Sequence, residues 1–143
     1  MRVLSTVTGH EDLVAHPEHI PSCAQVLKSE VLPPRATVLD VGCGTGLLCE
    51  ALAGSASSVT GCDASAGMVE VFRQKLQRIG APQNIRVVQA DLTAADPLGD
   101  QRFDVVTSVM TLHHLPDIPG EWETHSRIPP VFAGPSIALM RSI

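Results

Sequence analysis

The sequence predicts an α/β fold built on a doubly wound, mostly parallel sheet with helices on both faces. Three observations carry the prediction. Short β-branched runs alternate with stretches of helical periodicity, as in successive strand–helix units. The first such run enters a glycine-rich loop, and acidic residues follow three of the predicted strands. The chain has 143 residues, of which 44% are apolar, so one ordinary domain with a substantial core is expected.

The first predicted helix begins near His16-Pro17, because proline suits the first helical turn. Its apolar residues recur at spacings of three and four, which places them on one helical face. These residues are Ile20, Cys23, Leu27 and Val31. The helix is expected to end before Pro33-Pro34.

The next unit consists of a strand, a loop and a helix. Thr37–Val41 is predicted as a buried strand, 42–46 as the glycine loop, and Leu47–Ala53 as a short helix that Gly54 closes. A second strand is expected over Ser58–Gly61, reaching Cys62-Asp63.

Ser65 is a suitable N-cap for the third helix. An apolar stripe on this helix is expected to pack into the core. Its members are Met68, Val69, Phe72, Leu76 and Ile79. Strands follow over Ile85–Gln89 and Phe103–Met110.

The C-terminal part has a different character. Seven of the twenty residues from 116 to 135 are proline or glycine, and no helical period is present. Only Ile137–Met140 suggests a short strand or a helical turn. We therefore divide the chain into a core over residues 1–118 and an irregular tail over residues 119–143.

Composition excludes several classes of protein. The net charge is −5, from 15 acidic and 10 basic residues, which disfavours a nucleic-acid partner. Neither a signal peptide nor an apolar run of membrane-spanning length is found, so a cytoplasmic protein is expected. The four cysteines fit no zinc template, and no metal site is predicted. They are expected to be reduced thiols that act as small hydrophobic residues.

The spacing of the glycines separates two kinds of nucleotide loop. A dinucleotide fingerprint would need a third glycine at position 47, where Leu47 stands, and a P-loop would need a lysine. The pattern is instead G-x-G-x-G, with Asp40 two residues before it. A plain strand-to-helix turn is the alternative.

Acidic residues at the ends of three strands suggest what the loop binds. Asp40 would repel a phosphate and suit a cationic amine or sulfonium group. Asp63 could accept hydrogen bonds from two ribose hydroxyls, and Asp91 one from an adenine amino group. Leu92 and Met68 could flank the adenine ring. Asp63 as a helix N-cap and Asp91 as a turn residue are the alternatives.

Four motifs occur in order: VLDVGCGTG, GCDAS, QADL and FDVVTSVMTLHHL. Together they resemble the class I S-adenosylmethionine-dependent methyltransferase family, of Rossmann-like fold, and within it the small-molecule type 11 or UbiE-like group. The resemblance covers residues 37–115. It implies a methyltransferase with S-adenosylmethionine as cofactor and a small-molecule acceptor.

The resemblance also implies roles for individual residues. Those expected at the cofactor are Asp40, Gly42, Cys43, Gly44, Gly46, Asp63, Ala64, Met68, Asp91, Leu92, Ser108 and Val109. His113 and His114 would face the substrate and are the candidates for a general base. They are unsuited to share a metal ion, because adjacent residues on a strand point to opposite faces.

Beyond Leu115 the family pattern stops, because the family has three further strands. The fourth strand would then be an exposed apolar edge, open to a dimer or another partner. Two alternatives to an active methyltransferase follow. One is a catalytically incomplete cofactor-binding module that needs a partner. The other is a nucleotide-dependent oxidoreductase, which Leu47 disfavours.

Overall fold

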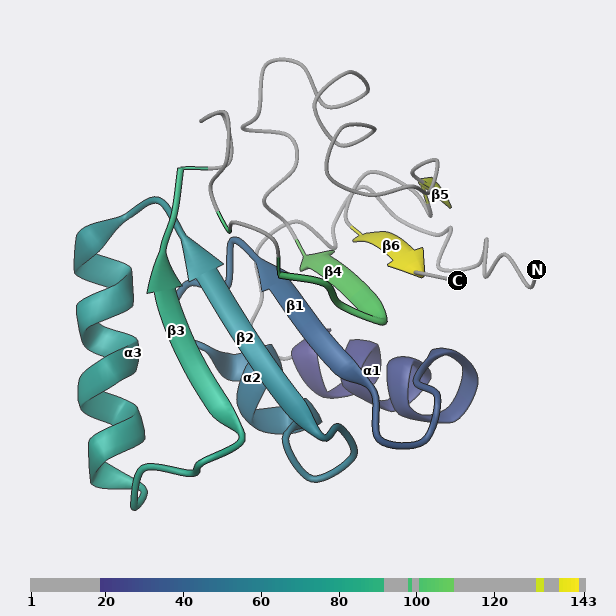
Figure 1. Cartoon of the computed structure of the whole chain (residues 1–143), viewed down its shortest axis with the longest axis horizontal. Coiled ribbons are helices and arrows are strands. Elements are labelled where there is room, and N and C mark those ends of the chain that lie inside the picture. The colour runs from purple at the N-terminus through teal and green to yellow at the C-terminus, as the bar shows by residue number, and fades with distance from the viewer. Residues whose placement is uncertain (1–18, 92–97, 99–100, 110–130, 133–136, 142–143) are drawn as a thin grey trace.

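A six-stranded sheet organises the part of the chain that the computed structural model describes, residues 19–91, 98, 101–109, 131–132 and 137–141 (Figure 1). The strand order is β3-β2-β1-β4-β6-β5. The strands are β1 (Thr37–Val41), β2 (Ser58–Asp63), β3 (Ile85–Gln89), β4 (Val105–Val109), β5 (Val131–Phe132) and β6 (Ile137–Arg141). The helices are α1 (His19–Val26), continued by a π-helical turn over Leu27–Val31, then α2 (Leu47–Leu52) and α3 (Ala66–Arg78).

Strands β1 to β4 form the predicted parallel sheet. Strand β1 pairs with β2 on one side and with β4 on the other, and β3 pairs with β2. The predicted bounds of β1 and β3 are confirmed residue for residue, because proline, glycine and polar residues flank both runs. The predicted start of α1 at His16-Pro17 lies outside the described residues.

The sheet continues beyond β4, and here the sequence-based expectation was wrong. Strand β6 pairs antiparallel with β4 over five residue pairs, from Val105 opposite Arg141 to Val109 opposite Ile137. Strand β5 then pairs antiparallel with β6. The edge of β4 is therefore covered by the chain's own tail, because this short apolar run supplies the backbone partners that β4 would otherwise lack.

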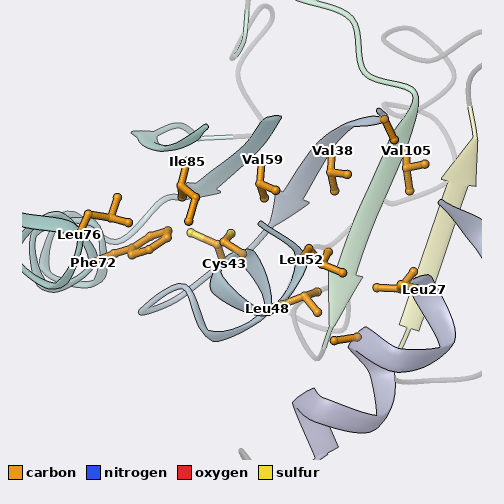
Figure 2. Close-up of a cluster of buried hydrophobic side chains, with 13 residues drawn as sticks. Leu27, Val38, Cys43, Leu48, Leu52, Val59, Phe72, Leu76, Ile85 and Val105 are labelled. Carbon is orange, nitrogen blue, oxygen red and sulfur yellow. The ribbon is translucent and has the colours of Figure 1, made fainter. Parts of the chain in front are cut away.

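One face of the sheet carries the larger core. Figure 2 shows Val38, Val59, Ile85 and Val105, one from each parallel strand, pointing toward the helices. All three described helices pack into this cluster, α1 through Ala24, α2 through Leu48 and Leu52, and α3 through Phe72 and Leu76, and the π-helical turn adds Leu27. On the opposite face, a smaller cluster of strand residues packs against Leu98 and Phe103. Helices were predicted on both faces of the sheet, and all the described helices lie on this one face.

Helix α3 shows how far a hydrophobic stripe predicts burial. Val69, Phe72 and Leu76 are buried, as expected. Met68 and Ile79, predicted in the same stripe, are 46% and 50% exposed. Met68 lies in the first turn and Ile79 caps the last, so the buried part of the stripe is confined to the middle of the helix. Within the described ranges, no helix is both long and apolar enough to cross a membrane.

Candidate functional site

The glycine loop between β1 and α2 is fastened to the neighbouring strand. The backbone N–H groups of Gly42 and Cys43 both donate to the carbonyl of Cys62 in β2, at 2.8 and 3.0 Å. The N–H of Gly46 donates back to the carbonyl of Cys43 at 2.9 Å, which closes the turn. The loop is thus held in a fixed shape at the carboxyl edge of the sheet, where open α/β sheets bind their ligands.

Two glycines of this loop are required for different reasons. Both have positive φ, +53° at Gly44 and +84° at Gly46, which disfavours any side chain. A Cβ on Gly46 would lie 2.1 Å from the ring of buried Phe72, so this glycine lets α3 pack against the loop. A Cβ on Gly44 would meet nothing within 4 Å. Open space therefore adjoins the backbone at Gly44, where a ligand could lie.

Asp63, at the end of β2, joins the loop to helix α3. One carboxylate oxygen accepts a hydrogen bond from the N–H of Gly44, and the other accepts one from the N–H of Ser65, both at 2.9 Å. The side chain of Ser65 accepts from the N–H of Met68, so Ser65 is the N-cap, as predicted. Asp63 is only half-buried, and its carboxylate retains lone pairs for further donors.

Asp40 lies beneath the loop, where the strand order reverses between β1 and β4. Its carboxyl group is 3% exposed and accepts hydrogen bonds from the Thr107 hydroxyl at 3.0 Å and the Cys49 thiol at 3.5 Å. Burial raises the pKa of Asp40 to about 7, although these two hydrogen bonds oppose the rise. Asp40 therefore changes its charge near neutral pH, and a cation held nearby would favour its ionised form.

Three buried thiols lie in or near the glycine loop, and one of them, that of Cys49, donates to Asp40. Cys43, Cys49 and Cys62 are buried and free, and Cys23 is half-buried and free, as the sequence predicted. A hydrogen bond with Cys43, together with burial, raises the pKa of Cys49 well above its usual value. Burial raises the pKa of Cys62 to about 12. Cys49 and Cys62 therefore stay protonated at neutral pH and serve as packing groups.

The other predicted residues surround this loop to different extents. Ala64 and Met68 are exposed next to Asp63, and Asp91 is exposed two residues after β3. Ser108, in β4, is 3% exposed, and its hydroxyl has no hydrogen-bond partner among the described residues. Val109 ends β4. Leu92, His113 and His114 lie outside the described residues.

The charged and polar groups at the glycine loop favour one kind of ligand over another. Two carboxyl groups, Asp40 and Asp63, lie at the loop, and a polyphosphate would be repelled by their charge. A nucleoside that carries a cationic group fits the same donors and acceptors. The buried hydroxyl of Ser108 offers one more unused polar group at the end of β4.

Sequence reasoning missed Thr107 as a part of this site. Its hydroxyl reaches Asp40 only because β4 lies directly beside β1, with Thr107 opposite Asp40 in the register. The two residues are far apart in the chain, and the strand pairing had to be known first. The alternating pattern of β4 does, however, place Thr107 on the same face as buried Val105.

Known proteins share this architecture and these motifs. Residues 38–124 match the family model of a methyltransferase domain. A ubiquinone biosynthesis O-methyltransferase of Thiobacillus denitrificans is 44% identical over 80 residues, which are 56% of this chain and 34% of the relative. The chain thus spans about a third of the length of that curated relative.

Two solved structures show the same likeness in three dimensions. The YcgJ protein of Bacillus subtilis superposes with a TM-score of 0.62 at 26% identity, over 74% of this chain and 43% of its own. A SAM-dependent methyltransferase of Aquifex aeolicus also gives 0.62, at 25% identity, over 76% of this chain and 64% of its own.

Proposed function

The chain belongs to the S-adenosylmethionine-dependent methyltransferase family, and we propose that it binds this cofactor over the glycine loop and transfers the methyl group to a small-molecule acceptor. The observation that carries the proposal is the pair of hydrogen bonds that the Asp63 carboxylate accepts. One carboxylate fixes both the loop, through Gly44, and the start of α3, through Ser65. The same carboxylate is bonded to Gly44, where an added Cβ would meet nothing within 4 Å.

Each part of the cofactor has residues suited to it. The ribose hydroxyls would donate to Asp63, because a carboxylate accepts several hydrogen bonds at once. The methionine part would lie along Gly42, Cys43, Gly44 and Gly46. Its positive charge would be stabilised by Asp40 from below, since opposite charges attract strongly where water is excluded.

The adenine ring would lie over the first turn of α3. Met68 supports this position, because its large apolar side chain is exposed and has no place in the core. Ala64, Leu92 and the carboxylate of Asp91 would complete the adenine site. Ser108 and Val109, at the end of β4, would line the cofactor on the side of the acceptor.

The cofactor supplies an activated methyl group, and the protein has to hold the acceptor in line with it. We propose a hydroxyl acceptor, because the curated relative is named as an O-methyltransferase. A hydroxyl must lose its proton during transfer, and His113 and His114 are the candidate general bases.

The remaining parts of the chain complete the proposal. Residues 1–118 would carry the cofactor site, and the tail from residue 119 would close the sheet beside β4. A cytoplasmic location is supported by the four free cysteines, since reduced thiols are typical of reducing compartments.

The replacement of Asp63 tests the cofactor site. Asp63→Ala should weaken S-adenosylmethionine binding, measured by titration calorimetry, by about tenfold or more, because a hydrogen bond to a charged group contributes about 1.5–3 kcal/mol. Asp63→Asn, which keeps one oxygen acceptor, should lose less. Methyl transfer from radiolabelled cofactor to a panel of phenols and alcohols then tests the reaction itself.

A matched carboxylate controls for charge. Glu70 lies on the exposed surface of α3, with Gln74 and Arg73 as its partners. Glu70→Ala should leave cofactor affinity unchanged. Equal affinity in wild-type protein and Asp63→Ala would refute the role of Asp63, and absence of binding to the folded wild-type chain would refute the proposed function.

A further inference from the structure

A groove runs between helices α1 and α2, on the helical side of the sheet. It has a volume of about 470 Å³, within the range of small-molecule sites, and it lies apart from Asp40 and Asp63. Its lining residues are Ile20, Pro21, Ala24, Gln25, Lys28, Leu47 and Ala51. None of them belongs to the proposed cofactor site, although Leu47 directly follows the glycine loop.

The lining of the groove is mostly apolar and includes two small side chains. Ala24 is 2% exposed and Ala51 is half-buried. Because each of these side chains is a single methyl group, space remains between the two helices. Leu47 is 43% exposed, although the other large apolar side chains of α2, Leu48 and Leu52, are buried. Apolar surface left open in this way is typical of binding grooves.

Charge is present at one end only. Ile20 and Lys28 are eight residues apart, which corresponds to about 12 Å along a helix, so the apolar and cationic ends of the groove are separated. Lys28 is exposed and has no carboxylate partner among the described residues. The one carboxyl group of α2, that of Glu50, is already paired with Lys75 at 2.8 Å. Lys28 is therefore the charged side chain in the described lining of the groove, in a chain of net charge −5.

We propose that this groove binds an amphipathic carboxylate, a molecule with an acyl or aromatic body and one anionic head. The body would lie over Ala24 and Ala51 and between Ile20 and Leu47, where it would displace water from apolar surface. The carboxylate would pair with Lys28, and the amide of Gln25 would donate a second hydrogen bond to it. A cationic or neutral molecule of the same length lacks the interaction with Lys28.

Octanoate, octanol and octylamine test the proposal, because they share one chain and differ in the head group. Each is titrated into protein with carbon-13-labelled alanine methyl groups, without S-adenosylmethionine. Octanoate should shift the signals of Ala24 and Ala51 and leave that of Ala64 beside Asp63 in place. Octanol should bind about threefold more weakly, since an exposed ion pair contributes modestly, and octylamine more weakly still.

Two variants locate the interaction. Lys28→Glu replaces attraction by repulsion and should weaken octanoate binding about tenfold. Arg73→Glu makes the same change of charge on the exposed surface of α3 and should have no effect. Ala51→Trp should fill the groove and abolish binding of octanoate.

The outcomes decide between the alternatives. Equal binding of octanoate and octylamine, or an unchanged octanoate affinity in Lys28→Glu, would overturn the anionic class of ligand. Absence of octanoate binding to the folded protein would overturn the site. Because the titration contains no cofactor, a negative result here is independent of the result for Asp63.

Discussion

Asp40 is a buried carboxyl group whose ionised form is disfavoured by the free protein and favoured by the proposed cationic ligand. Its pKa is about 7 in the folded chain, against an ordinary value of 3.8, because burial removes water from the carboxylate. The unfolded chain loses this proton at lower pH than the folded chain. The stability that protonated Asp40 contributes is therefore complete below about pH 4 and is lost as the pH rises to about 7.

Asp40→Asn should remove this dependence. The amide stays neutral and can still accept from Thr107, so the free energy of unfolding of the variant should rise relative to wild type as the pH increases from 5 to 8. Chemical denaturation across that range measures the difference. Asp104 does not interfere, because hydrogen bonds from Thr37 lower its pKa and keep it ionised. A difference that stays constant with pH would contradict the assignment.

Gly46 and Gly44 have different roles in the loop: Gly46 allows the packing of Phe72, and Gly44 adjoins the proposed binding site. Gly46→Ala should lower the free energy of unfolding by about 3 kcal/mol, because it combines left-handed strain with a clash against Phe72. Gly44→Ala should cost only the strain, about 1 kcal/mol. It should nevertheless weaken S-adenosylmethionine binding, since its methyl group enters the open space. Equal losses of stability in the two variants would contradict this division.

At the scale of elements, the start of α3 is held by hydrogen bonds to Ser65 and to Asp63, the last residue of β2. Ser65 caps the helix, and its own N–H is held by Asp63, which also holds the glycine loop. Further along, Lys75 of α3 pairs with Glu50 of α2 and lies 5.9 Å from the centre of the Phe72 ring. Helices α2 and α3 are thus fixed relative to each other at the loop and again farther on, about one turn along α2 and nearly three turns along α3.

Ser65→Ala should destabilise the start of α3. Loss of the N-cap hydrogen bond to Met68 should lower the free energy of unfolding by about 1 kcal/mol. Ser55→Ala is the matched control, because Ser55 is exposed and caps no helix. Thermal and denaturant unfolding of both variants measure the effect. Similar stability of the two variants would show that Ser65 does not act as a cap.

At the scale of the whole molecule, the sheet is completed by a strand of opposite direction. Strand β6 lies beside β4, and β5 beside β6, so the apolar edge of the parallel sheet is covered from within the chain. Because the two strands are antiparallel, Ile137 lies opposite Val109, at the same edge as the glycine loop. The tail therefore enters the sheet next to the proposed cofactor site.

Removal of residues 131–143 should expose the edge of β4. The shortened chain should form oligomers or aggregates, seen by size-exclusion chromatography with light scattering, because unpaired strand edges associate. A chain that ends at Arg141 keeps β6 and should behave as the full chain does. A shortened chain with unchanged size and stability would show that β6 is dispensable.

The sequence by itself determined the parallel core and the residues of the loop. Thr37–Val41 and Ile85–Gln89 are predicted by local patterns, since β-branched runs between proline, glycine and polar residues have few other ways to fold. The glycine spacing and the acidic strand ends were readable for the same reason. Each is a short-range feature, because the local conformation depends on residues that are close together in the sequence.

Tertiary structure decided everything that depends on strand pairing. The contact of Thr107 with Asp40 exists because β4 lies beside β1, and the raised pKa of Asp40 follows from the burial that this pairing completes. The exposure of Met68 and the position of β6 depend in the same way on what packs nearby. A hydrophobic pattern indicates which residues are stabilised by burial, but the space available at each position is set by segments distant in the chain.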